Sequence, residues 1–340
     1  MEWIGIDLHK TESQICILVE DGGVFERRIK TSSDRFRAVL GCRLPARVLL
    51  EASTESEWVA RLIEGMGHEV VVADPNFAAM YATRSRKVKT DRRDARTLAE
   101  ACRLGAYRAA HRTSEKQTHA RATLAVRDVL VRTRSRLISV ARALLRREGL
   151  RLPSGEAESF VSRLETLSIS PALLAEIGPI VTLLPAITDE INELDRDIAA
   201  TARMDPVTAR LQTAPAVGPI IATAFAATID DPHRFRGAHQ VQAYLGLVPS
   251  EMSSGEKQKR GHITKAGNPR VRWLLVQAAW SIMRSTRRDS TALREWAMAV
   301  ASRRGKRVAV VALARRLAGV LFAMMRDETA YDPPRLRAVA

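Results

Sequence analysis

The sequence has 340 residues, and its 54 Lys and Arg against 38 Asp and Glu give a formal net charge of +16. Such an excess favours a polyanionic partner, with nucleic acid as the first candidate, because basic side chains that neutralise phosphates release condensed counterions. With 46% hydrophobic and 27% charged residues, the chain can form packed cores and falls outside the disordered class. Its length predicts two or three domains.

Membrane and extracellular classes are disfavoured by the sequence. We find no run that approaches the roughly 18 uncharged apolar residues of a membrane span, and Asp7 interrupts the segment where a signal peptide would be apolar. The cysteines Cys16, Cys42 and Cys102 lie far apart, in no pair with metal or redox spacing. We therefore expect a cytoplasmic protein without a membrane partner, and oxygen ligands for any metal.

The positive charge is concentrated in two zones. Residues 84–151 contain 20 basic and 6 acidic side chains, and residues 255–288 contain 9 basic and 1 acidic side chain. Each zone adjoins a neutral or acidic region. This pattern indicates a binding footprint rather than a general solubility device.

The first third of the chain alternates strand and helix patterns. The predicted order is strands 3–8, 14–19 and 24–29, a helix near 33–41, a strand 47–51, a helix 55–66 and a strand 68–73. Asp21-Gly22-Gly23 suits the hairpin turn between the second and third strands. We expect an α/β domain over residues 1–112.

The middle region, residues 113–204, is predicted to be helical. A long basic helix over 115–149 has an a/d seam with alternating spacings of four and three residues, widened by a second apolar stripe at Leu124, Val131, Ile138 and Leu145. The seam residues are Val126, Leu130, Thr133, Leu137, Val140 and Leu144. An acidic helix follows near 187–200. The two helices are expected to pair as an antiparallel hairpin, to pair between subunits as a coiled coil, or simply to pack within a domain.

Residues 205–330 predict a mainly helical C-terminal domain. Leu211 to Pro219, followed by an apolar helix, looks like half of a helix-hairpin-helix, in which backbone N–H groups near Gly218 would contact a DNA phosphate. The basic string Glu256 to Lys265 follows. Further helices are predicted from Gly267-Asn268-Pro269 onwards, near 291–301 and near 308–325.

Four acidic residues occupy positions where a charge needs a partner. Asp7 is the charged residue of an otherwise apolar strand, and Glu51 closes a second buried strand. Asp91 and Asp94 begin a predicted helix and share one of its faces. Convergence of the four would suit two Mg²⁺ ions, which prefer oxygen ligands and support phosphodiester chemistry.

Each acid alone also has a structural explanation. Asp91 and Asp94 suit the dipole at the first turn of a helix, whereas Asp7 suits a turn and Glu51 suits a helix cap. Their combination and order along the chain favour a site, and they resemble those of the RNase H/RuvC-like nucleases.

Four segments together resemble one family over almost the whole chain. GIDLHK, LLEAS, KTDRRDA and LGLVPSEMSSGEKQKRGHITKAGNPRVRWLL look like the successive signatures of the insertion-sequence one-ten family of DEDD transposases. The resemblance implies a RuvC-like domain, a coiled coil and a C-terminal domain that carries a nucleophilic serine. It also implies that an RNA encoded by the element guides the recognition of donor and target DNA.

The resemblance also implies roles for single residues. Asp7, Glu51, Asp91 and Asp94 are the metal-binding acids, and Ser254, next to Ser253, is the nucleophile that forms a phosphoserine link. The family usually has Gly where this chain has Ala216. On turn chemistry alone Ser254 is a loop serine. The basic string that follows it could be a solvated loop, but nine basic residues against one acidic residue favour phosphate contact.

The nucleic-acid contacts are assigned mainly to basic residues. The expected set is Lys89, Gly218, Lys257, Lys259, Arg260, Lys265 and Arg270. Because no His or Asp in a motif-like position accompanies Ser254, its base and positive charge are expected from the metal-bound acids of the other domain. His9 and His262 are given no role. Aromatic residues make up only 5% of the chain, too few for a base-stacking platform, which suits a protein that leaves sequence reading to RNA pairing.

The sequence therefore predicts an RNA-guided, Mg²⁺-dependent DNA transposase or recombinase, acting as a homo-oligomer, either a dimer or a tetramer. Two alternatives remain. One is a metal-dependent junction-resolving nuclease without a serine intermediate, and the other is a catalytically silent nucleic-acid-binding protein.

Overall fold

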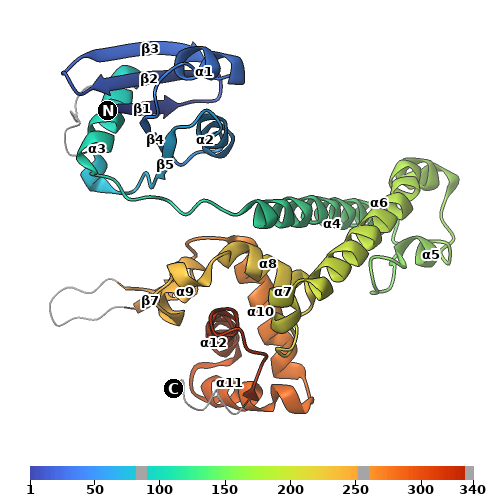
Figure 1. The fold of residues 1–340 in the computed structure, drawn as a ribbon. Helices are drawn as coiled ribbons and strands as arrows, with labels where there is room; N and C mark the ends of the chain where they lie inside the picture. Colours follow the sequence, from blue (N-terminus) through green and yellow to red (C-terminus); the bar gives the residue numbers. More distant parts are fainter. Residues whose placement is uncertain (82–89, 252–259, 334–340) are drawn as a thin grey trace. The chain divides into compact units, whose positions relative to one another are not determined.

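The computed structural model describes residues 1–81, 90–251 and 260–333 (Figure 1). The chain forms two compact units, which we call unit 1 (Met1–Thr113) and unit 2 (Ser114–Ala340). Each unit is described by itself.

Unit 1 is built on a mixed five-stranded sheet. Its elements are β1 (Glu2–Leu8), β2 (Glu12–Val19), β3 (Val24–Lys30), α1 (Ser33–Leu40), β4 (Arg47–Glu51), α2 (Ser56–Glu64), β5 (Glu69–Ala73), the 3₁₀ helix η1 (Ala78–Tyr81) and α3 (Asp91–Leu104). The strand order is β3-β2-β1-β4-β5, with β1–β2 and β2–β3 antiparallel and β1–β4 and β4–β5 parallel. The predicted order of elements and the α/β class are confirmed.

Alternation along β1 divides its side chains between two layers. Ile4, Ile6 and Leu8 belong to the buried cluster that includes residues of α1 and α2. Because successive side chains of a strand point to opposite faces, Gly5 and Asp7 lie on the other face, which α3 covers. The sheet is therefore sandwiched between α1 and α2 on one side and α3 on the other.

Gly5 permits very close packing between β1 and α3. A Cβ atom at this position would lie 2.2 Å from both the Ala95 carbonyl oxygen and the Ala99 amide nitrogen. Only a residue without a side chain fits this contact. The absence of a side chain at Gly5 thus sets the distance between Asp7 and the first turn of α3.

Unit 2 consists mostly of helices. Its elements are α4 (Glu115–Arg147), α5 (Phe160–Leu164), α6 (Pro171–Met204), α7 (Pro206–Leu211), α8 (Pro219–Ile229), the 3₁₀ helix η2 (Pro232–Arg234), α9 (Ala238–Tyr244), β6 (Pro249–Glu251), β7 (Arg260–Ile263), α10 (Pro269–Arg284), the 3₁₀ helix η3 (Arg288–Ser290), α11 (Thr291–Arg304) and α12 (Lys306–Arg326). The mainly helical class predicted for this region is confirmed.

Helices α4 and α6 pack against each other as an antiparallel hairpin within one chain. Leu145, near the end of α4, clusters with Leu173 at the start of α6, whereas Leu124 and Ile198 share the cluster at the other end. Arg127 of α4 pairs with Asp195 of α6. The opposite charges of the two helices therefore meet inside the hairpin.

The predicted seam of α4 is buried only in part, since Leu137 and Leu144 pack against the hairpin clusters. Val126 is 54% exposed and Val140 is 45% exposed, whereas Leu124, Ile138 and Leu145 are buried. Two apolar stripes run along this helix, and both have heptad spacing. The contact with α6 buries the second stripe most deeply, which the sequence pattern alone does not predict.

The helix predicted over 187–200 is much longer in the structure. It begins at Pro171 and continues through Pro179 and Pro185, although proline removes a backbone hydrogen bond. Leu173 and Ile177, which lie before these prolines, are buried beside Leu145. Packing of this apolar face offsets the missing bonds, so the prolines do not end the helix.

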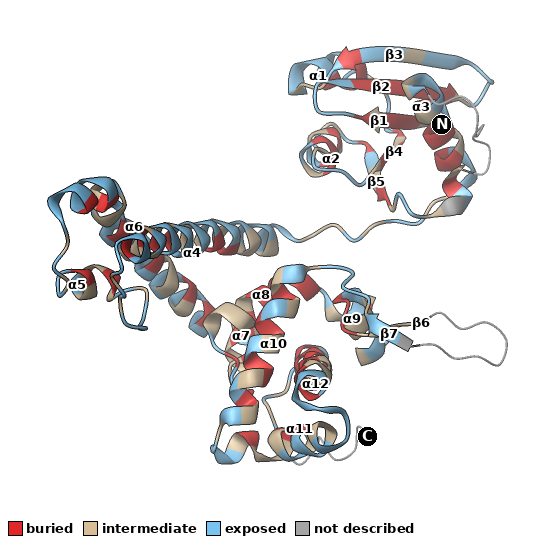
Figure 2. Cartoon of the chain, turned by 180° about the vertical axis from the view of Figure 1, so that it is seen from behind, coloured by how far each residue is buried: buried red, intermediate tan, exposed pale blue. Residues whose placement is uncertain are grey.

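The core of unit 2 surrounds α12. This helix packs against α7, α9, α10 and α11, and its buried residues run from Ala309 to Met325. Much of α12 is coloured as buried in Figure 2. Within the described chain, α6 and α12 are long and apolar enough to cross a membrane by length and composition. Each stretch includes charged residues, such as Glu176 in α6 and Arg315 in α12, so neither is the long uncharged apolar run that the sequence was expected to lack. For α12, burial in the core accounts for the apolar composition.

Candidate functional site

Asp7 and Glu51 lie side by side on neighbouring strands. Strands β1 and β4 are parallel, with Ile6 opposite Leu50, so Asp7 and Glu51 are the next residues of the two strands. Both side chains lie on the face that α3 covers, because Ile6 and Leu50 belong to the cluster on the opposite face. The strand register thus places two carboxylates together at one end of the sheet.

The first turn of α3 adds the acid pair. Thr90 is the N-cap of the helix, and its side-chain oxygen accepts a hydrogen bond of 3.3 Å from the Arg93 amide. The helix therefore begins at Asp91, and Asp94 lies in the same turn. Since α3 packs directly on β1 through Gly5, its first turn lies close to the end of that strand.

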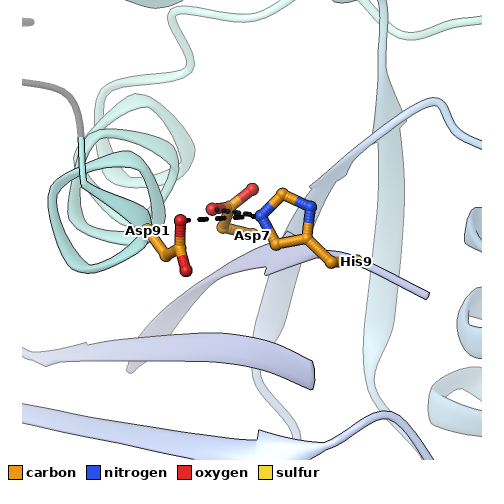
Figure 3. Close-up of side chains that lie close together, drawn as sticks. All are labelled: Asp7, His9 and Asp91. Atoms are coloured by element: carbon orange, nitrogen blue, oxygen red, sulfur yellow. Dashed lines mark ion pairs between the residues drawn. The ribbon is translucent and has the colours of Figure 1, made fainter. Parts of the chain in front are cut away.

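His9 completes the cluster, although sequence reasoning gave it no role. Its Nε2 atom lies 3.3 Å from Asp7 Oδ2 and 3.7 Å from Asp91 Oδ1 (Figure 3). One ligand atom from each of Asp7, His9 and Asp91 lies within 4.8 Å of the others. The available sequence signal was the two-residue spacing from Asp7, which puts both side chains on one face if the strand continues.

The charges of the other three acids, Glu51, Asp91 and Asp94, act on the Asp7 carboxyl group. Burial raises the pKa of Asp7, His9 lowers it, and the negative charges of Asp94, Asp91 and Glu51 raise it again. Glu51 Oε1 accepts a hydrogen bond of 2.6 Å from the Tyr81 hydroxyl. The structure therefore brings together the acids that the sequence predicted.

A divalent cation fits this group of residues. The Asp7 side chain is only 14% exposed, and its Oδ2 atom is buried and has no hydrogen-bond partner within the described residues. A buried carboxylate oxygen without a partner carries a large free-energy cost. Carboxylates from three elements and one imidazole nitrogen form a donor set that suits Mg²⁺ or Mn²⁺.

Several predicted residues lie outside the described residues, namely Lys89, Ser253, Ser254, Lys257 and Lys259. Strands β6 and β7 border the segment that contains Ser254, with Glu251 paired to Arg260. Arg260, a predicted nucleic-acid contact, is the first residue of β7.

The segment at residues 244–246 packs closely against the segment at residues 266–267, because both contain a glycine at the contact. A Cβ atom on Gly246 would lie 2.3 Å from the Ala266 oxygen, and one on Gly267 would lie 1.9 Å from the Tyr244 oxygen. Lys265 itself is exposed, with a φ of 57°. Its amide donates to the Gly246 oxygen at 3.1 Å. This backbone contact fixes the position from which the Lys265 side chain extends.

The turn before α8 holds Ala216 in an unfavourable conformation. Ala216 has a φ of 59°, in the left-handed region that glycine adopts without strain. Gly218 is the exposed N-cap of α8. A glycine at this position, which the family resemblance implies, would adopt this conformation without strain.

Arg270 is engaged inside unit 2. It pairs with Asp128 of α4, and its guanidinium lies 5.1 Å from the centre of the Trp273 ring. Burial lowers its pKa and Asp128 raises it. The structure therefore gives Arg270 a role in joining α10 to α4, beside the nucleic-acid contact that the sequence predicts.

Unit 2 contains a basic groove whose lining lysine and arginine residues, apart from Lys265, were not predicted from the sequence. It has a volume of about 1820 Å³, and its walls come from α9, β7, α11, α12 and the segment after α12. Its basic lining residues include Lys265, Arg304, Arg307, Arg315 and Arg316, beside apolar Trp296, Val308 and Val311. The run Arg303-Arg304-Gly305-Lys306-Arg307 was the available signal.

Comparisons with known proteins agree with this architecture. A model for the transposase IS116/IS110/IS902 family matches residues 195–306, and a transposase model of the DEDD type from IS110 elements matches residues 4–148. The second match assigns the mixed sheet of unit 1 to the RNase H-like α/β fold and implies dependence on a divalent metal.

Curated relatives match almost the whole chain. The transposase for insertion sequence element IS1111A of Coxiella burnetii is 30% identical over 338 residues, covering 96% of this chain and 90% of the relative. A probable family 20 transposase of Pseudomonas aeruginosa is 32% identical, covering 97% and 98%. The transposase for IS1328 of Yersinia enterocolitica is 28% identical, with the same coverage of 97% and 98%. The chain therefore belongs to the IS116/IS110/IS902 family of transposases, enzymes that recombine DNA.

Proposed function

We propose that this transposase cleaves and rejoins DNA with Ser254 as the nucleophile, and that Asp7, Glu51, Asp91 and Asp94 hold Mg²⁺. The observation that carries the proposal is the cluster in unit 1, where Asp7 and Asp91 approach the same point and Asp7 Oδ2 is buried without a hydrogen-bond partner in the described part of the chain. Removal of either carboxylate would leave an incomplete ligand set for the ion.

The four acids and the ion have separate roles in this proposal. The bound ion supplies positive charge for the phosphate oxygens during phosphodiester exchange. The carboxylates fix where that charge lies. Glu51 is oriented by the Tyr81 hydroxyl, and Asp91 is oriented by the capped first turn of α3. This preorganisation would limit the reorganisation needed when charge develops on the phosphate.

A covalent link between Ser254 and the DNA phosphate would conserve the energy of the broken phosphodiester bond, so that the strands can be rejoined. Its Oγ forms a bond to phosphorus while the bond from phosphorus to a deoxyribose oxygen breaks, and the departing strand end leaves as a hydroxyl that carries the proton. Attack by the hydroxyl of another strand reverses the step and releases the serine. The assignment rests on the motif that contains Ser254 and on the resemblance of that motif to the family signature.

Donor DNA, target DNA and a guide RNA encoded by the element are the proposed partners. The proposed contacts are Lys89, Gly218, Lys257, Lys259, Arg260, Lys265 and Arg270, together with the basic groove defined above. Contacts of this kind bind phosphates and carry little sequence information. RNA pairing would then supply the sequence recognition, and the low aromatic content supports this division of roles.

We further propose a homo-oligomer, either a dimer or a tetramer, that acts in the cytoplasm on DNA. Helix α4 keeps Val126, Val129 and Val140 exposed at 54%, 61% and 45%. Their spacings of three and eleven residues place them in one heptad seam, which a second copy would cover. The functional division into residues 1–112, 113–204 and 205–330 also belongs to this proposal.

The experiment combines the protein with Mg²⁺, the noncoding RNA that flanks its gene, donor DNA and target DNA. Denaturation should leave a protein–DNA adduct that maps to Ser254. Ser254→Ala should abolish the adduct and strand exchange while nucleic-acid binding persists, and the neighbouring Ser253→Ala variant serves as the matched control. Asp91→Asn should remove activity with the fold intact.

The outcomes separate the proposed mechanism from its rivals. Hydrolysed products without an adduct would identify a junction-resolving nuclease. Binding without cleavage of any substrate would indicate a silent binding protein. Full activity in EDTA would remove the metal from the mechanism, and equal activity without RNA would remove the guide.

A further inference from the structure

His9 has an unusual position beside the acids of unit 1. It follows the last residue of β1 directly, and its ring reaches both a strand carboxylate and a helix carboxylate (Figure 3). The ring is 56% exposed on its other side. An exposed imidazole is free to point into solvent, so its orientation between Asp7 and Asp91 needs an explanation.

The distances fit shared ligation better than hydrogen bonding. His9 Nε2 is 3.3 Å from Asp7 Oδ2 and 3.7 Å from Asp91 Oδ1. A hydrogen bond between imidazolium and carboxylate is shorter, at about 2.7–2.9 Å. Two ligand atoms that each lie about 2.1 Å from one ion, at angles between 90° and 120°, are about 3.0–3.6 Å apart. The contact with Asp7 lies inside this range, the contact with Asp91 is 0.1 Å longer, and all three ligand atoms lie within 4.8 Å of one another, a spacing close to that of ligands of one ion.

The backbone of His9 is also fixed. Its carbonyl oxygen accepts a hydrogen bond of 2.7 Å from Thr31 Oγ1, which lies 2.7 Å from Ser13 Oγ in turn. Thr31 follows the end of β3, so three consecutive strands of the sheet contribute to this arrangement. Fixing the backbone reduces the conformational freedom that the ring loses when it binds an ion.

We propose that His9 Nε2 is a third ligand of the divalent cation held by Asp7 and Asp91, and that this imidazole shifts the preference of the site from Mg²⁺ towards Mn²⁺. The inference rests on the proposed metal site and adds a ligand to its four acids. Imidazole is a poor ligand for Mg²⁺, which favours oxygen and gives up water reluctantly, whereas Mn²⁺ lies between the hard cations and the nitrogen-seeking transition metals.

The test measures metal binding directly. Mn²⁺ is titrated into the full-length protein without DNA, and free Mn²⁺ is followed by electron paramagnetic resonance. Pulsed measurements on protein labelled with ¹⁵N-histidine then detect a nitrogen bound to the ion. His9→Ala should weaken Mn²⁺ binding at least about tenfold and remove the nitrogen coupling, while Mg²⁺ binding, measured by competition, changes less than about threefold.

Two control variants distinguish the possible results. His119→Ala changes an exposed histidine of α4 and should leave both measurements as in the wild type. Asp7→Asn should abolish Mn²⁺ binding. Tight Mn²⁺ binding without nitrogen coupling, unchanged in His9→Ala, would overturn the role of His9 and leave the acid site standing. Absence of Mn²⁺ binding to the wild type would overturn this inference and the proposed metal site together.

Discussion

Gly5→Ala should disrupt the candidate site without changing any of its proposed ligands. The new methyl group would lie 2.2 Å from backbone atoms of Ala95 and Ala99, whereas ordinary contacts begin near 3.4 Å. Relief of the clash therefore requires α3 to move by about 1 Å from β1, because the opposing atoms are backbone and cannot rotate away. The acids on α3 would move by a similar distance relative to Asp7.

The expected loss has two parts. Overpacking of this kind costs about 1–3 kcal/mol of the free energy of unfolding. A displacement of about 1 Å in a catalytic arrangement can reduce a rate about 100-fold. Urea denaturation measures the first part, and strand exchange together with Mn²⁺ affinity measures the second.

Gly65→Ala is the matched control in unit 1. Gly65 has a φ of −64°, and a methyl group there would meet atoms no closer than 3.4 Å. This variant should keep wild-type stability within about 0.5 kcal/mol, as surface substitutions usually do. If Gly5→Ala matched the control in stability, metal affinity and strand exchange, the argument from backbone contact would be refuted.

Three further predictions concern other parts of the chain. In EDTA, Asp7→Asn should stabilise the protein by about 1 kcal/mol at neutral pH, because it removes a buried charge. The pKa of Asp7 is raised in the folded state above the ordinary value of 3.8, so wild-type stability should fall as pH rises from that value through the raised pKa, and pH-dependent urea denaturation of Asp7→Asn should lack this decline. Ala216→Gly should raise the free energy of unfolding by about 0.5 kcal/mol in urea denaturation, since it relieves a φ of 59°, and a loss of stability would contradict this. Changing Arg304 and Arg307 together to Ser should weaken DNA binding and reduce the slope of log K against log salt by about two, with Arg196→Ser on α6 unchanged, and an unaltered slope would exclude the groove as a phosphate contact.

Much of unit 1 was predictable because its information is local. Alternation in β1 and β4 showed which residues are buried, and the order of acids along the chain indicated the cluster that the structure contains around Asp7. The role of His9 was not predictable in the same way. Its ring direction depends on where β1 ends and on the hydrogen bond from Thr31, which is a long-range contact.

The helical hairpin shows a second limit of sequence patterns. The two stripes of α4 have equivalent spacing, and only the partner helix decides which one is buried most deeply. The sequence pattern placed the start of this helix near residue 187, whereas the structure starts it at Pro171, because the packing of Leu173 and Ile177 compensates for the hydrogen bonds lost at the two internal prolines. The basic groove combines five separate segments, so its charge was visible in composition while its shape was not.

The central place of α12 has a consequence for biosynthesis. Unit 1 ends at Thr113, whereas the helix that fills the core of unit 2 begins only at Lys306. Domains fold in order as the ribosome synthesises them. The RNase H-like unit is therefore complete early. The apolar faces of α7, α9, α10 and α11 stay exposed to solvent until α12 has been synthesised. A frameshift before Lys306 would yield a product with a folded acid cluster and an aggregation-prone remainder, so premature termination would silence transposition.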